Sequence, residues 1–136
     1  MNEFLWPVRV YYEDTDSGGV VYYANYLKFM ERARTEWLRA LGFEQDELIR
    51  EEGVIFAVRS VQLDYLLPAR FNDQLNVSSQ VIKAGKASLT LEQIISRQPD
   101  NAVLCKGIVK IASLDAASFR VTTLPEALLK KTKQGE

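Results

Sequence analysis

Histidine does not occur at any of the 136 positions of this sequence, and that absence excludes more than any other feature of its composition. A Ser-His-Asp triad and a Cys-His pair both need an imidazole as general base, so neither can be built from this chain. Zinc sites of the HExxH kind, or with two cysteines and two histidines, are excluded for the same reason. Acid–base chemistry near neutral pH therefore falls to a carboxylate, a lysine, a tyrosine or bound water.

Cysteine is almost absent as well, since Cys105 is the only one. A single cysteine cannot form an intramolecular disulfide, which agrees with a reducing compartment, and its apolar surroundings (LCKGIVKIA) favour a core position over a nucleophilic one. No stretch approaches the ~20 apolar residues of a membrane span, and residues 1–7 lack the pattern of a signal peptide. These absences predict a cytoplasmic protein with no integral membrane segment.

Charge of neither sign predominates, because 17 Lys and Arg oppose 18 Asp and Glu for a formal net charge of −1. This balance provides no overall attraction to nucleic acid or to an anionic membrane, so we expect no nucleic-acid partner. The chain is 47% apolar and 26% charged, and it has no repeat or linker-like stretch. These values predict one globular domain over residues 1–136.

Apolar periodicity and turn residues predict a strand, a long helix, a short helix, four long strands and a terminal helix, over 6–13, 25–41, 44–51, 54–66, 74–83, 87–97, 102–114 and 124–133. The short connections between the later strands favour antiparallel neighbours. The long helix carries an apolar stripe about 120° wide, made of Tyr26, Phe29, Met30, Ala33, Trp37, Ala40 and Leu41. Such a stripe fits a helix pressed onto a sheet, and the order of elements predicts an α+β domain.

The turn over residues 14–20 (DTDSGGV) joins the first predicted strand to the long helix. Asp, Ser and Gly are ordinary turn formers, so a plain surface loop is one interpretation. A calcium loop fits poorly, because Asn25 would stand where a bidentate carboxylate is needed. In the catalytic interpretation, a carboxylate acts as base or nucleophile beside a helix N-terminus that stabilises an oxyanion. That arrangement would be a hydrolytic site without histidine.

The segment from Asp14 to Tyr26 closely resembles the signature of the 4-hydroxybenzoyl-CoA thioesterase family, especially its branch of bacterial acyl-CoA thioesterases encoded with the Tol-Pal envelope system. The resemblance covers WPVRVYYEDTD, GGVVYYANYLKFMERARTEWLR and FAVRSVQLDYLLPARFNDQL, and it fades after about residue 115. It implies a hotdog fold, in which a curved antiparallel sheet of about five strands wraps a long central helix. It also implies a homodimer or homotetramer, formed by joining sheets edge to edge.

The same resemblance implies an acyl-CoA thioesterase, which hydrolyses an acyl-CoA thioester to the free acid and CoA and needs no cofactor beyond the CoA of its substrate. The family's catalytic aspartate matches Asp16, and the backbone N–H that polarises the thioester carbonyl matches that of Tyr23. The Tol-Pal branch commonly has histidine at the latter position. Tyrosine keeps the backbone donor there but provides no imidazole.

Lys83, Lys86 and Ser88 surround the Gly85 turn, where relatives hold basic and hydroxyl groups toward the CoA phosphates. An ordinary solvated turn is the other interpretation. Arg59 and Arg70 could also contact phosphates, although a structural ion pair is the simpler role for each. The acids of the strand region, Asp64 and Asp73, are interpreted as structural.

Two other functions fit the same scaffold. An acyl-carrier-protein thioesterase would differ only in what carries the pantetheine arm of the substrate. A non-catalytic scaffold could bind acyl carriers for the envelope Tol-Pal system, but an intact Asp16 argues against it. Dehydratases of the hotdog fold use a histidine and are excluded by composition.

Overall fold

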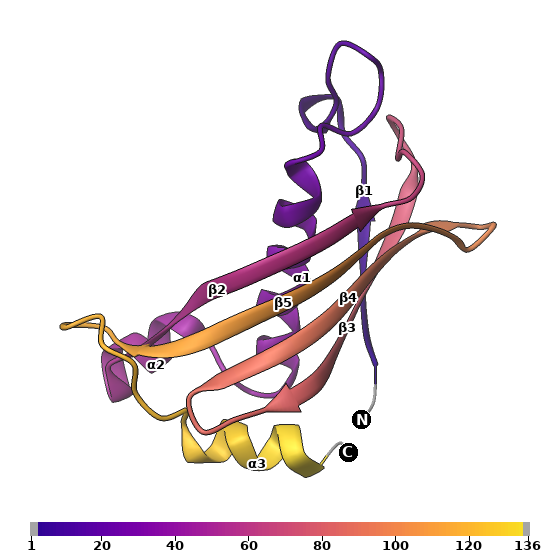
Figure 1. Ribbon diagram of the computed structural model, residues 1–136. Helices are drawn as coiled ribbons and strands as arrows, with labels where there is room; N and C mark the ends of the chain where they lie inside the picture. Colours follow the sequence, from indigo (N-terminus) through magenta and orange to yellow (C-terminus); the bar gives the residue numbers. More distant parts are fainter. Residues whose placement is uncertain (1–2, 135–136) are drawn as a thin grey trace.

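Figure 1 shows the fold as a computed structural model that describes residues 3–134. Five strands form one antiparallel sheet, with β1 over Phe4–Arg9, β2 over Val54–Tyr65, β3 over Gln74–Ala84, β4 over Ser88–Gln98 and β5 over Ala102–Asp115. Their order across the sheet is β1-β3-β4-β5-β2. The strands nearest each other in sequence therefore form the centre, and β1 and β2 form the two edges.

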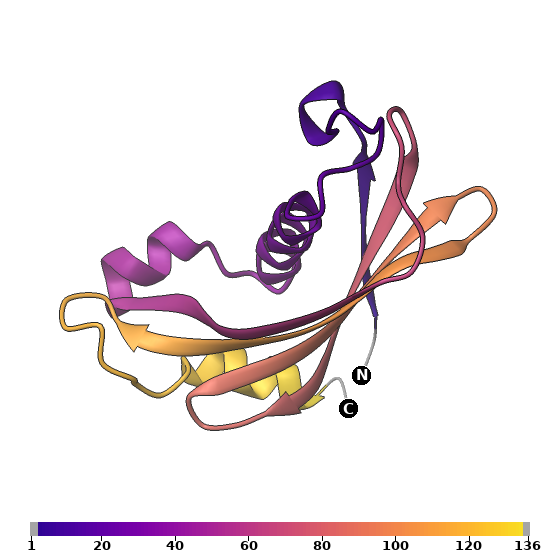
Figure 2. The same cartoon turned by 45° about the horizontal axis from the view of Figure 1, so that its top comes forward.

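The long helix α1 (Asn25–Ala40) lies against the concave face of this sheet, which curves around it (Figure 2). The predicted α+β class and the long central helix are confirmed. Most of the predicted apolar stripe is buried, namely Tyr26, Phe29, Met30, Ala33 and Trp37. Ala40 is exposed and Leu41 is half-buried, whereas Leu38 is buried although it lies outside the predicted stripe.

The reason for this shift lies at the C-terminal end of the chain. Helix α3 (Glu126–Gln134) adds Leu128 to the apolar cluster that contains Trp37 and Leu38, and Leu124, two residues before the helix, joins the same cluster. These contacts draw the buried face of α1 toward Leu38 over its last turn. Leu124, predicted to start the terminal helix, instead precedes it in extended chain.

The first strand is shorter than predicted, because β1 ends at Arg9 rather than at residue 13. Its only strand partner is β3, and their register ends where Arg9 faces Gln74, the first residue of β3. The alternation of buried and exposed side chains continues past Arg9, since Val10 is fully buried and Tyr11 is exposed. Residues Tyr12–Asp14 then form a short 3₁₀ turn.

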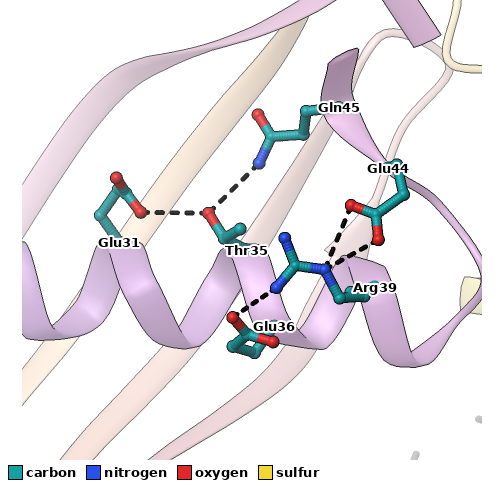
Figure 3. A network of polar contacts seen from close by, with 6 residues as sticks. All are labelled: Glu31, Thr35, Glu36, Arg39, Glu44 and Gln45. Carbon is teal, nitrogen blue, oxygen red and sulfur yellow. Dashed lines mark hydrogen bonds and ion pairs between the residues drawn. The ribbon is translucent and has the colours of Figure 1, made fainter. Parts of the chain in front are cut away.

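The short helix α2 (Gln45–Glu52) follows α1 and contacts the start of β2. Figure 3 shows the polar contacts at this junction, where the guanidinium of Arg39 bonds Glu36 at 2.6 Å and Glu44 at 2.8 Å. Both carboxylates raise the pKa of Arg39 above its usual value, led by Glu44. Exposed ion pairs contribute little stability, so these contacts chiefly set the direction of the connection.

Strand β2 is an open edge of the sheet, and most of its residues are exposed or half-buried. A cleft of about 600 Å³ separates it from α1 and includes Leu27, Arg34, Val58 and Val61 in its lining. Within the described residues, none of the helices is long and apolar enough to cross a membrane.

Candidate functional site

The loop between β1 and α1 is fastened to the connection between β2 and β3, at the upper end of the molecule in Figure 1. The N–H of Val10 donates to the carbonyl of Asp73 at 3.0 Å, and the N–H of Val21 donates to that of Ala69 at 2.8 Å. The rings of Tyr12 and Phe71 stack with centroids 3.8 Å apart. These contacts join residues 48 to 63 positions apart in the sequence, so the β2–β3 connection supports the loop.

Asp16 stands at the tip of this loop, within a tight turn. Its N–H donates to the carbonyl of Val20 and its own carbonyl accepts from the N–H of Gly19, both at 3.0 Å. Gly19 has a φ of +78°, which favours glycine. The Oδ1 atom accepts from the N–H of Gly18 at 2.8 Å, yet the side chain of Asp16 is exposed. The turn thus orients a carboxylate that solvent and substrate can reach.

The neighbouring acid, Asp14, is only 6% exposed and is fully engaged in holding the loop. Its Oδ1 accepts from the side-chain amide of Asn25 and its Oδ2 accepts from the N–H of Tyr11, each at 2.9 Å. Its backbone carbonyl accepts from the N–H of Tyr22. The two acids of the motif are thus in opposite environments, and Asp16 is the one that faces outward.

Tyr23 lies in the turn that leads into α1. Among the described residues no acceptor bonds its N–H, and Ala24, the N-cap residue before α1, makes no side-chain capping hydrogen bond. Free N–H groups at a helix start carry partial positive charge and can receive an anionic oxygen. The phenol of Tyr23, and to a smaller extent the charge of Asp16, raise the pKa of Tyr22. The charge of Asp16 therefore reaches Tyr22, the residue before Tyr23.

A pocket of about 270 Å³ opens beside Tyr23, lined by apolar and aromatic residues, namely Val21, Tyr23, Tyr26, Tyr65, Leu66, Leu67 and Pro68. Tyr26 is the buried member of this lining, and its hydroxyl accepts from the N–H of Ala69 at 3.1 Å. Burial raises the pKa of Tyr26, so its phenol stays neutral at ordinary pH. Tyr65 also lines this pocket, from the C-terminal end of β2. The sequence did not predict this, because no motif connects Tyr65 with the segment around Tyr23.

The predicted CoA-binding residues Lys83, Lys86 and Ser88 lie at the opposite end of the molecule, at the turn between β3 and β4 (Figure 1). Both lysines are exposed, and the turn is closed by the N–H of Gly85, which donates to the carbonyl of Ser88 at 2.8 Å. The length of β3, about 33 Å at ~3.3 Å per residue, separates this turn from the Asp16 loop. A single chain does not bring these residues to Asp16.

The other charged residues of the strand region also have defined places. Arg59 and Arg70 are exposed, and among residues 3–134 neither has an acidic partner within 4 Å, so the predicted ion pairs are wrong. Asp73 is structural as expected, because its Oδ2 accepts from the N–H of Arg70 at 2.9 Å. In the described part of the chain, no three potential metal ligands come together.

The sequence profile of the thioesterase-like superfamily matches residues 10–132 of this chain. The acyl-CoA thioesterase YbgC of Haemophilus influenzae is 43% identical over 125 residues, which cover 92% of this chain and 90% of that protein. The acyl-CoA thioester hydrolase YbgC of Escherichia coli O6:H1 is 41% identical over 131 residues, 96% of each chain. The chain therefore belongs to the thioesterase-like superfamily, and the predicted 4-hydroxybenzoyl-CoA thioesterase family fits this assignment.

Solved structures agree with this assignment. A probable thioesterase from Bartonella henselae has a TM-score of 0.86 at 32% identity, covering 91% of this chain and 100% of its own. Slr0204, a 1,4-dihydroxy-2-naphthoyl-CoA thioesterase from Synechocystis, has a TM-score of 0.90 at 20% identity, covering 97% and 96%. The latter likeness concerns the fold alone. The hotdog fold and the class of thioester hydrolase are both confirmed.

Proposed function

We propose that this protein hydrolyses acyl-CoA thioesters, with Asp16 as base or nucleophile and the start of α1 as the oxyanion site. The observation that carries the proposal is that one loop, between β1 and α1, presents both an exposed Asp16 carboxylate and a Tyr23 N–H without an acceptor among the described residues, in a chain that has no histidine. Its relatives from Haemophilus influenzae and Escherichia coli are named as acyl-CoA thioesterases, which supports the choice of substrate.

In the reaction, the thioester carbonyl oxygen accepts a hydrogen bond from the N–H of Tyr23. The N–H and the helix dipole stabilise the negative charge that develops on this oxygen as the carbonyl carbon becomes tetrahedral. Asp16 takes a proton from water as the water oxygen bonds the carbon, and it returns this proton to the sulfur as the C–S bond breaks and CoA leaves as the thiol. Alternatively, Asp16 attacks the carbon directly, and the C–S bond breaks to release the CoA thiolate, which takes a proton from solvent. Water then hydrolyses the resulting anhydride and frees the acid and Asp16. Neither route needs a cofactor.

The role of Lys83, Lys86 and Ser88 toward the CoA phosphates depends on assembly, because one chain holds them far from Asp16. A second subunit could supply them, which makes a homodimer or homotetramer part of the proposal. The open edge of β2 supports it, since an unprotected edge strand with exposed Val58 and Val61 favours pairing with another copy. Light scattering at micromolar concentration should give at least twice the monomer mass, and a monomer would contradict this part.

Two narrower statements belong to the same proposal. The substrate could be carried by an acyl carrier protein instead of CoA, or the protein could act as a scaffold with the Tol-Pal envelope system, as its resemblance to that branch suggests. A cytoplasmic location agrees with a free thiol at Cys105 and with the cytoplasmic use of CoA.

One experiment tests the activity and the role of Asp16 together. Purified protein is assayed with acyl-CoA thioesters of several chain lengths, and with matched acyl-carrier-protein thioesters. Asp16→Asn should lower kcat/KM by at least ~100-fold, the scale of a lost acid–base group. Glu13→Gln is the matched control, since it removes the same charge from an exposed acid three positions away. An Asp16→Asn protein that keeps half of the activity would overturn the mechanism, and a lack of hydrolysis by the wild type would overturn the function.

A further inference from the structure

Asp14 connects the two parts of the proposed site. Its backbone carbonyl accepts from the N–H of Tyr22, immediately before Tyr23, and its Oδ1 accepts from the amide of Asn25, two positions after Tyr23. Asp16 follows Asp14 by two positions in the same segment. The residue that would provide the base and the residue that would provide the oxyanion donor are therefore both placed relative to Asp14.

No other side chain makes this connection. Among residues 3–134, Asp14 is the one residue of the Asp16 loop whose side chain bonds a side chain of α1. The carboxylate of Asp16 bonds within its own turn, to Gly18, and the hydroxyl of Thr15 bonds the carbonyl of Tyr12. Removing the contact between Asp14 and Asn25 would leave the loop and the helix start joined by backbone hydrogen bonds and by the apolar packing of Val21 near Tyr26.

The chemistry of Asp14 is unusual for a residue that only shapes a turn. It is buried, and within the described chain no cation lies within 4 Å of it. Arg9 of β1 and Arg32 of α1 line the same cleft of about 240 Å³ without forming an ion pair, together with Tyr11 and Glu13. Burying a carboxylate is costly unless hydrogen bonds satisfy it, and here Asn25 and the N–H of Tyr11 do so.

We propose that Asp14 and Asn25 form a positioning pair that sets the separation between the Asp16 carboxylate and the Tyr23 N–H. This inference rests on the proposed function, since it concerns the geometry of that same site. Misplacing a catalytic group by about 1 Å can lower a rate ~100-fold. The pair would therefore affect kcat strongly even though neither side chain touches the substrate.

The test exchanges the two side chains, singly and together. Asn25→Asp places a second carboxylate where the amide now donates at 2.9 Å, and two carboxylates that close cannot both ionise. The contact can then form only when one of them is protonated. Adding Asp14→Asn should restore it with the roles reversed, because an amide at position 14 can donate to a carboxylate at position 25 and still accept from the N–H of Tyr11.

Expected results follow for each variant, assayed with the best acyl-CoA substrate in protein shown to be folded by circular dichroism and melting. At pH 8, Asn25→Asp should lower kcat about 10- to 100-fold with little change in KM, and the loss should shrink as pH falls toward 5. Asp14→Asn alone should cost less than ~10-fold, since the amide of Asn25 can turn over to accept. The double variant should recover kcat to within ~3-fold of the wild type and lose the pH dependence.

A merely structural role would lower the melting temperature without moving the pH profile of kcat. The inference is therefore overturned if folded Asn25→Asp keeps its kcat at pH 8, or if the folded double variant does not recover. If Asn25→Asp does not fold, Asn25→Ala replaces it and should lower kcat about 10-fold, with no rescue by Asp14→Asn. Full activity of folded Asn25→Ala would also overturn it. The Asp16→Asn assay judges the proposed function separately, so the two failures can be told apart.

Discussion

The phenol of Tyr65, at the end of β2, donates a hydrogen bond of 3.0 Å to the backbone carbonyl of Tyr23, 42 positions away in the sequence. The rings of the two residues also meet edge to face, with centroids 6.3 Å apart, and Tyr65 makes a similar contact with Tyr26 at 5.5 Å. Burial, as the largest cause, raises the pKa of Tyr65, so the phenol keeps its proton at neutral pH. The edge strand thus anchors the peptide group that leads into α1.

Tyr65→Phe should weaken this anchor while leaving the ring contacts in place. A neutral hydrogen bond contributes about 0.5–1.5 kcal/mol, so kcat/KM for acyl-CoA should fall about 2- to 10-fold. Tyr12→Phe is the matched control, because it removes an exposed phenol from the same end of the molecule and keeps the stacked ring. Equal rates for wild type and Tyr65→Phe would show that the bond has no part in the site.

Gly107 allows β5 to pass closely under α1. A Cβ atom built there would lie 2.7 Å from Cδ2 of Leu63 and 3.0 Å from the Cε and Sδ atoms of Met30. The contacted atoms are the ends of flexible side chains that can shift, so Gly107→Ala should lower the free energy of unfolding by only about 1 kcal/mol in urea titrations, the low end of the cost of overpacking. Gly85→Ala serves as control, since its nearest atom would be at 3.4 Å. Equal urea midpoints for Gly107→Ala and Gly85→Ala would contradict the close approach of β5 to Leu63 and Met30.

Cys105 is fully buried, as the apolar sequence around it predicts. Burial raises the pKa of its thiol to about 11 from 9.0. Between these values the unfolded chain ionises first and binds fewer protons, so the thiol makes the folded state less stable as pH rises from 9 to 11. Cys105→Ala should flatten this part of the stability profile and keep hydrolysis within ~3-fold of the wild type, because a buried neutral thiol is inert.

Direct labelling checks the same prediction. A thiol reagent at pH 8 should leave the native protein unmodified and should label it once after unfolding in urea. Rapid stoichiometric labelling of the native protein would place Cys105 at the surface, and a large loss of hydrolysis in Cys105→Ala would give the thiol a role that its burial excludes.

Features set by local pattern were predictable from the sequence. The period of Tyr26, Phe29, Met30 and Ala33 identified the buried face of α1, because helical spacing alone places them together. Gly42, with a φ of +98°, ends the helix where glycine is favoured. The alternation of Val8 and Val10 identified inward-facing positions, although the ladder of β1 stops earlier, since that depends on where β3 begins.

Features set by contacts between distant segments were not predictable. The sheet order places β2 at an edge, next to β5, and nothing in the composition of β2 indicates that position. The motif located Asp16 and Tyr23 but did not distinguish the buried environment of Asp14, which depends on Asn25 in the next element. The bond from Tyr65 and the placement of Lys83 and Lys86 at the opposite end likewise require the tertiary fold.

Tyr23 provides the last prediction, because its two candidate donors can be separated. If the backbone N–H receives the oxyanion, Tyr23→Phe should retain most of the hydrolysis, since the amide and the start of α1 are unchanged. Tyr23→Pro should abolish it, because proline has no N–H and the loss of one oxyanion donor typically costs ~100- to 1,000-fold in kcat. Circular dichroism and melting temperature control for a wider disturbance of the backbone by proline.

The phenol of Tyr23 is the competing donor, since a tyrosine hydroxyl can donate to a substrate or orient a carboxylate. Its ring lies beside that of Tyr22, with centroids 4.9 Å apart, and the phenol of Tyr23 raises the pKa of Tyr22. The backbone account and the phenol account predict values of kcat for Tyr23→Phe that differ by about two orders of magnitude. A ~100-fold loss of kcat in that variant at an unchanged melting temperature would assign the chemistry to the side chain, whereas near-normal turnover leaves the N–H as the donor.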